Sequence, residues 1–252
     1  MFCYQCEQTA KGTGCDVFGV CGKDPKTAAL QDLLIHVTKG ISMYAHRAAQ
    51  LGATDPEIDK YVIEALFTTV TNVNFDPLRL EGILRQGAVI KTKAKALYEG
   101  AAIKAGKSPE KLDGPAGWIP AQDLAGLISQ GEAVVINKDV PTRGADLVGL
   151  EYLIVYGLKG MAAYADHAHV LGQDDPKVYA FFHEALDFLT RPNLGVDDLL
   201  GMALRCGEIN IRIMELLDAA NTGVYGHPVP TPVRITAVKG KAILVSGHDL
   251  KD

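Results

Sequence analysis

The chain contains two versions of one sequence, KGISMYAHRAAQLGATDPEIDKYVIEAL at residues 39–66 and KGMAAYADHAHVLGQDDPKVYAFFHEAL at residues 159–186. Aligned without a gap, the two versions are identical at 12 of 28 positions and are separated by a constant offset of 120. The same offset relates Arg85 to Arg205 further along the chain. A single offset over so long a stretch indicates that a structural unit has been duplicated.

Helix start signals recur through this unit. Aspartate is followed by proline four times, at Asp24-Pro25, Asp55-Pro56, Asp76-Pro77 and Asp175-Pro176. Aspartate accepts hydrogen bonds from the free amides of a first helical turn, and proline at the first helical position has no amide to leave unpaired. Apolar residues follow at helical spacing, which predicts helices near residues 25–51, 55–72 and 76–105. Each copy, residues 25–105 and 145–226, is expected to be a three-helix bundle with short antiparallel connections.

Three further segments complete the expected organisation. Residues 1–24 form a cysteine-rich loop, and residues 106–144 form a connector with a breaker-rich loop, a short helix and a possible strand at 133–136. In residues 227–252, alternate prolines exclude a helix, and the apolar run 241–247 predicts a strand buried in a parallel sheet. The fold class is therefore mainly α, followed by the first strand of an α/β domain that is cut short.

Charge and hydropathy exclude several classes of partner. The 252 residues have a net charge of −5, which excludes a strongly basic nucleic-acid-binding protein and gives no reason to expect an anionic membrane surface as partner. No apolar run approaches the roughly 18 residues of a membrane span. The first residues lack the features of a signal peptide. We expect a cytoplasmic protein with neither a nucleic-acid nor a membrane partner.

Four of the five cysteines are Cys3, Cys6, Cys15 and Cys21, in the spacing Cys-x2-Cys-x8-Cys-x5-Cys. Four thiolates can close a tetrahedral zinc site or bind an iron–sulfur cubane. Structural zinc usually has a second Cys-x2-Cys pair, which is absent here, and the interleaved glycines let backbone amides approach sulfide. An iron–sulfur cluster is favoured, with zinc and free or catalytic thiols as alternatives. Cys206 stands alone and is expected to be a small buried residue.

Three further positions are candidates for a role. His248, in Ser-Gly-His-Asp at the end of the predicted parallel strand, is a candidate site residue, because sites in open α/β sheets form at the carboxyl ends of strands. The alternative is a solvated loop histidine. The repeated tyrosines, Tyr44 and Tyr164, are expected in the bundle core or in a hydrogen bond to a loop. The repeated arginines are expected to pack against a neighbouring helix end, with anion binding as the alternative.

Two motifs resemble a known family. The opening MFCYQCEQT of residues 1–9, with GVCGK at residues 19–23, resembles the start of the hybrid-cluster (prismane) proteins, the hydroxylamine reductases. VSGHDL at residues 245–250 resembles the start of that family's first Rossmann-like domain, and the duplicated unit is similar to its helical N-terminal domain. The resemblance implies a [4Fe-4S] cubane on Cys3, Cys6, Cys15 and Cys21. It also implies that His248 is a ligand of the hybrid iron–sulfur–oxo cluster, whose other ligands lie in α/β domains that are not in this sequence.

The function implied by the resemblance is reduction of hydroxylamine, with two electrons and two protons, to ammonia and water. This chain would be the N-terminal part of such an oxidoreductase and would not catalyse the reaction by itself. Its expected partners are a small nitrogen-oxide substrate such as hydroxylamine, a redox electron donor and the missing C-terminal α/β domains. Two other functions remain open at this point: an independent iron–sulfur electron-transfer protein and a zinc-stapled helical scaffold.

Overall fold

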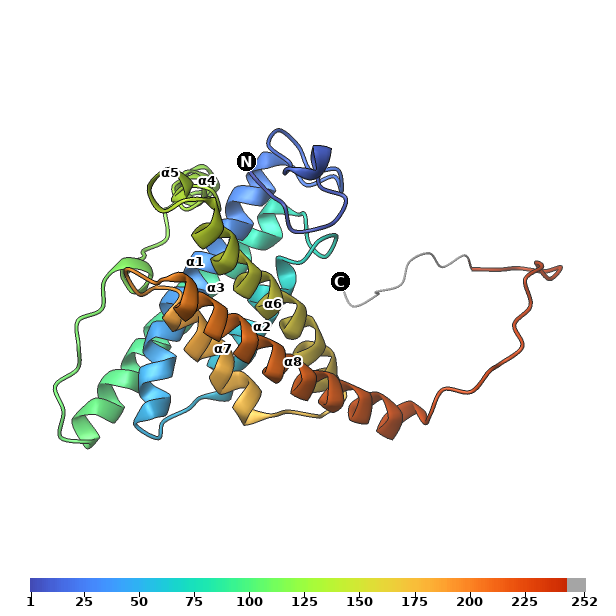
Figure 1. The fold of residues 1–252 in the computed structure, drawn as a ribbon. Helices are drawn as coiled ribbons and strands as arrows, with labels where there is room; N and C mark the ends of the chain where they lie inside the picture. The colour runs from blue at the N-terminus through green and yellow to red at the C-terminus, as the bar shows by residue number, and fades with distance from the viewer. Residues whose placement is uncertain (244–252) are drawn as a thin grey trace.

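The structure is a computed structural model, which describes residues 1–243 and is almost entirely helical there (Figure 1). The long and medium helices are α1 (Pro25–Gln50), α2 (Pro56–Thr68), α3 (Pro77–Lys104), α6 (Ala145–Val170), α7 (Pro176–Phe188) and α8 (Val196–Tyr225). The short ones are η1 (Ala10–Gly12), η2 (Gly114–Gly117), α4 (Leu124–Glu132) and α5 (Val140–Arg143). Within the described residues, β structure is limited to one isolated bridge between Cys3 and Cys15.

The helix limits confirm the duplication. Helices α1 and α6 begin and end 120 residues apart, as do α2 and α7, and the limits of α3 and α8 depart from this offset by one residue. The predicted caps are present, because the Asp24 carboxylate accepts from the Thr27 amide and Asp175 accepts from the Lys177 amide. Helix α2 ends at Thr68, four residues before the predicted end. Asn72, with φ +64°, adopts a left-handed conformation that a right-handed helix cannot include.

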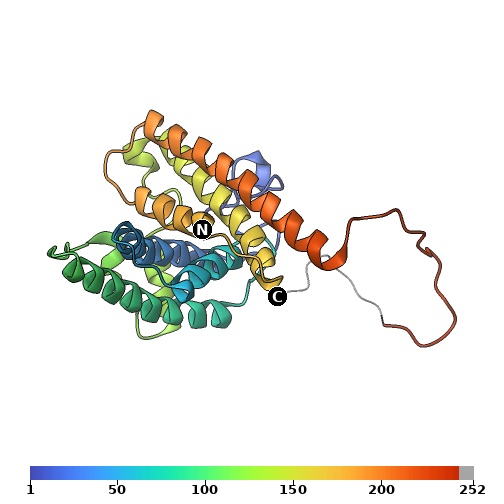
Figure 2. The same ribbon diagram turned by 90° about the horizontal axis from the view of Figure 1, so that it is seen from below.

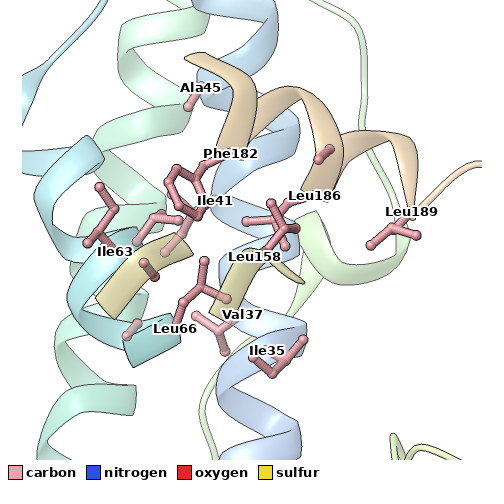
Figure 3. Packing of buried hydrophobic residues seen from close by; sticks show 14 of the residues in the cluster. Ile35, Val37, Ile41, Ala45, Ile63, Leu66, Leu158, Phe182, Leu186 and Leu189 are labelled. Atoms are coloured by element: carbon pink, nitrogen blue, oxygen red, sulfur yellow. The ribbon is translucent and has the colours of Figure 1, made fainter. Parts of the chain in front are cut away.

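The two copies do not pack as separate bundles. The short middle helix of each copy packs chiefly against a long helix of the other copy, α7 on α1 and α2 on α6. Figure 3 shows Phe182 of α7 beside Ile41 of α1, and Leu186 of α7 beside Leu158 of α6. One continuous cluster of buried apolar side chains therefore spans both copies. We call this arrangement, in which each middle helix packs on the other copy, the exchange of middle helices. It joins the two copies into one helical body.

Equivalent positions in the two copies differ in their surroundings. Tyr44 is buried, as expected, whereas Tyr164 is 40% exposed, so the expectation of a core position was wrong for the second tyrosine. Arg85 bonds Glu81 and the carbonyl oxygens that precede α4. Arg205 instead pairs with Glu184 of α7. The duplication thus repeats helix lengths but not every contact.

In the connector, one prediction was right and one was wrong. The short helix is α4, whose Gly131 lies so close to α1 that a Cβ there would be 2.1 Å from the Ala29 carbonyl oxygen. Residues 133–136 do not form a strand. The Val134 amide donates to the Gly131 carbonyl oxygen in a turn that ends α4, and no neighbouring strand in the described part of the chain could pair with this segment.

The segment after α8 extends away from the helices (Figures 1 and 2). Gly226, with φ +78°, ends α8, and residues 227–232 are non-helical as predicted. Of the predicted strand at 241–247, residues 241–243 have no regular secondary structure. The remainder, with VSGHDL and His248, lies outside the described residues. None of the helices between residues 1 and 243 is both long enough and apolar enough to cross a bilayer.

Candidate metal centre

The cysteine-rich loop folds back on itself at the N-terminal end of α1 (Figure 1). Cys3 and Cys15 exchange backbone hydrogen bonds of 3.0 and 2.7 Å, which places the two ends of a tight loop side by side. Gly14 must be a glycine, because its φ is +141° and a Cβ would lie 2.5 Å from the Phe2 ring. These features fix the path of the chain between the first and third cysteines.

All four N-terminal cysteines line one small pocket, together with Lys23 and, from the turn after α2, Thr71. Cys15 is buried and the other three are partly exposed, and all four are free thiols. Within residues 1–243, no three His, Cys, Asp or Glu side chains are arranged to hold a metal ion. Cys206 is elsewhere, buried in α8 with its Sγ 3.5 Å from Met161 Sδ, and burial raises its pKa to about 11.

Backbone groups stabilise negative charge on Cys15. The Ala10 amide donates to Cys15 Sγ at 3.4 Å, and the Thr9 hydroxyl lies 3.8 Å from the same sulfur. Hydrogen bonds from the backbone at Ala10 and Val20 lower the pKa of the Cys15 thiol, against the opposing effect of burial. Such bonds are typical of thiolates that bind iron–sulfur clusters.

A glycine leaves room beside another of the thiols. A Cβ at Gly19 would lie 3.2 Å from Cys21 Sγ and 3.0 Å from the Cβ of Lys23. Both distances are shorter than ordinary van der Waals contact, so a larger residue would displace the Cys21 thiol or its neighbours. The loop is therefore built closely around its sulfur atoms.

The second repeat holds the loop through a buried lysine. Lys159 of α6, 7% exposed, donates from Nζ to Gln5 Oε1 at 2.8 Å. The Gln5 amide in turn donates from Nε2 to Thr71 Oγ1 at 2.7 Å. Gln5 lies between Cys3 and Cys6 in sequence, so this chain of hydrogen bonds joins the first two cysteines to α6 and to the turn after α2.

Aromatic rings pack beside this lysine. The Tyr4 ring lies 5.5 Å from the Tyr156 ring, centroid to centroid, and Tyr152 is 5.8 Å from Tyr156. Lys159 Nζ lies 5.5 Å above the Tyr156 ring. Burial raises the pKa of Tyr4, and the neighbouring Cys3 raises it further. The tyrosines are therefore neutral and shield the cysteine loop from water on the side of α6.

The residues that line the pocket are of the kinds that hold an anionic group through thiolates, but their side chains are not arranged to hold a single metal ion. The chain supplies four thiols on one pocket, an amide directed at sulfur and two lysines that are each less than 10% exposed, Lys23 and Lys159. Iron–sulfur clusters and zinc tetrathiolates both carry negative charge once four thiolates bind them. Sequence reasoning proposed the cysteines but missed Gln5, Lys23 and Lys159. Lys159 could have been found, because helical spacing places it on the same face as the apolar Val155 and Ala162.

The chain is similar to known proteins over its whole length. The Prismane/CO dehydrogenase family matches residues 1–252. A hydroxylamine reductase of Rhodospirillum rubrum is 55% identical over all 252 residues of this chain, and one of Methanocella arvoryzae is 50% identical. In both cases the chain spans 46% of the relative's length. Similarity at this level over every residue identifies the chain as a member of the Prismane/CO dehydrogenase family.

Proposed function

We propose that this chain is the N-terminal part of a hydroxylamine reductase and binds a [4Fe-4S] cubane through Cys3, Cys6, Cys15 and Cys21. The observation that supports the cubane most directly is that these four thiols, and not Cys206, line one pocket. The names of the relatives support the reaction, because curated proteins about 50% identical to the chain are hydroxylamine reductases. The proposal includes a cytoplasmic location, because thiolates that bind a cluster must stay reduced.

The chain's own residues would provide binding and charge compensation. When bound, a [4Fe-4S] cubane supplies single electrons at low potential. The four thiolates would hold it, the Ala10 amide would donate to the Cys15 sulfur, and Gln5 would hold the segment between Cys3 and Cys6. The aromatic side chains beside Lys159 would exclude water.

The reaction itself would need the rest of the protein. Hydroxylamine, two electrons and two protons give ammonia and water, so an external electron donor must supply both electrons. We propose that His248 contributes an imidazole ligand to a hybrid iron–sulfur–oxo cluster, whose other ligands come from C-terminal α/β domains. The resemblance of residues 245–250 to the family motif supports this assignment.

Metal analysis tests the cubane. We expect anaerobically purified protein to contain the four irons and four sulfides of a cubane, and alanine at any of the four N-terminal cysteines to remove them. Cys206→Ala is the matched control and should leave this iron in place. Zinc in place of iron, or loss of four irons from Cys206→Ala, would refute the assignment.

Activity tests the role of His248. In the complete protein, His248→Ala should abolish reduction of hydroxylamine and leave the EPR signal of the reduced cubane intact. Residues 1–252 alone should be inactive. Full activity from this segment would contradict the proposal.

A further inference from the structure

Two buried lysines adjoin the cysteine loop. Lys23 is 4% exposed and lines the cysteine pocket, with its Nζ 5.6 Å from the centre of the Phe75 ring. Lys159 is 7% exposed and its ammonium bonds the Gln5 side chain. Lysine is rarely this buried without a partner of opposite charge, because removing an ammonium from water is costly.

The described residues offer these lysines only partial compensation. Between residues 1 and 243, no carboxylate forms an ion pair with either lysine within 4.0 Å. Lys159 interacts electrostatically with three groups: Lys23 disfavours its charge, whereas the Asp32 carboxylate on α1 and Cys3 favour it. Both lysines also act on Asp32. When Lys23, Lys159 and Asp32 are all charged, one positive charge is in excess beside the loop, and burial lowers the pKa of Lys159 to about 7. An anionic group in the cysteine pocket would balance the excess charge.

The position of Lys159 determines which group its positive charge can stabilise. Lys159 reaches the loop through Gln5, one of the two residues between Cys3 and Cys6. Reducing a thiolate-bound cluster by one electron adds one negative charge to it. A buried cation nearby stabilises the more negative state, and the low polarity of the surroundings strengthens the effect.

We propose that Lys159 is a positioning residue that raises the reduction potential of the N-terminal cluster, through an ammonium that Gln5 holds beside Cys3 and Cys6. This inference rests on the proposed cubane. Helix α6 of the second repeat would thus influence the reduction potential of a cluster whose proposed ligands all lie in the first 21 residues. Lys159→Met should disfavour the one-electron reduction about tenfold, and a tenfold change corresponds to about 59 mV for a one-electron couple.

The duplication provides a matched control. Lys39 of α1 is the repeat equivalent of Lys159, at the same offset of 120. Its charge interacts with Glu151, Asp139 and Arg143 and not with a cysteine. Lys39→Met therefore removes the same charge from an equivalent helix position, away from the pocket.

The test is an EPR-monitored redox titration of the complete protein, purified anaerobically and reduced with dithionite, with iron and sulfide measured in each sample. We expect a lower cubane potential in Lys159→Met, a potential close to that of the unmodified protein in Lys159→Arg, and no change in Lys39→Met. Equal potentials in Lys159→Met and Lys39→Met, with iron retained in both, would overturn the inference and leave the proposed function standing. Absence of iron from the unmodified protein would refute the proposed function, and the inference would fall with it.

If Lys159→Met does not fold or loses iron, Gln5→Met tests the same contact without a change of charge. It removes the acceptor that holds the ammonium and should lower the potential in the same direction, by less than tenfold in the redox equilibrium. An unchanged potential in an iron-loaded Gln5→Met protein would then overturn the inference.

Discussion

His183 of α7 links three helices through a buried polar contact, and its replacement should destabilise the helical body. Its Nδ1 lies 3.0 Å from Ser42 Oγ on α1, and its Nε2 lies 2.8 Å from Asp59 Oδ1 on α2. Ser42 is fully buried and the His183 side chain is 5% exposed. The equivalent residue in the first repeat is Ile63, which suggests the substitution His183→Ile.

The magnitude follows from the groups left without partners. A buried polar group that loses its partner costs roughly 1–3 kcal/mol, and His183→Ile removes a partner from both Ser42 and Asp59. The Asp59 side chain is 17% exposed and regains some hydration, which places its cost at the low end. We therefore expect the free energy of unfolding to fall by about 2–4 kcal/mol.

A second His–Asp pair provides the control. His169 Nδ1 lies 2.8 Å from Asp174 Oδ1, the same separation as in the buried pair, but these side chains are 37% and 45% exposed. His169→Ile should cost no more than about 1 kcal/mol, as is usual for exposed pairs. Both variants would be unfolded in urea and followed by far-UV circular dichroism. Losses of stability that agree within about 0.5 kcal/mol, the usual scatter for surface substitutions, would refute the reasoning from burial.

Three further predictions concern backbone contacts, pH and the loop. Gly40→Ala should lower the urea midpoint, because its Cβ would lie 2.2 Å from a backbone carbonyl oxygen of η2, whereas Gly82→Ala, with nothing within 4 Å in helix α3, should raise it. Burial lowers the pKa of His36 to about 4, from 6.5 in the unfolded chain, so the unfolded state binds the proton more tightly. Stability should fall as the pH drops from 6.5 toward 4, and His36→Gln should lose less over this interval in urea unfolding at each pH. Gly14→Ala should reduce the iron content per chain, because its Cβ would collide with the Phe2 ring.

Local signals in the sequence were sufficient to predict the helices. The Asp-Pro pairs depend on interactions within one helical turn, so they predicted the starts of α1, α2, α3 and α7 to within one residue, whereas the end of α2 was misplaced. The cysteine spacing likewise indicated that the four N-terminal thiols belong together, and they line one pocket. The Asp-Pro pairs and the cysteine spacing each lie within a short stretch of sequence, so they can be interpreted without knowledge of the tertiary packing.

Predictions that required tertiary packing were incomplete. Nothing local distinguishes a middle helix that packs on its own repeat from one that packs on the other, so the exchange of α2 and α7 was not predicted. The apolar residues 133–136 suggested a strand, although a β-branched run can equally line a turn that packs against helices. A core position was one of the two expectations for both Tyr44 and Tyr164, but only Tyr44 is buried, because a shared sequence position does not imply a shared environment.

The exchange of middle helices also explains how a loop attached to one repeat can depend on the other. The cysteine loop precedes α1, yet the contact with the Gln5 side chain comes from Lys159 on α6. Helix α2 packs on α6, so the turn that follows α2 brings Thr71 to the same glutamine. A duplication alone would give two equivalent surfaces, one near Lys39 and one near Lys159. The N-terminal segment covers only the second of these, and this asymmetry makes one lysine part of the candidate site and leaves its repeat equivalent among ordinary charged neighbours.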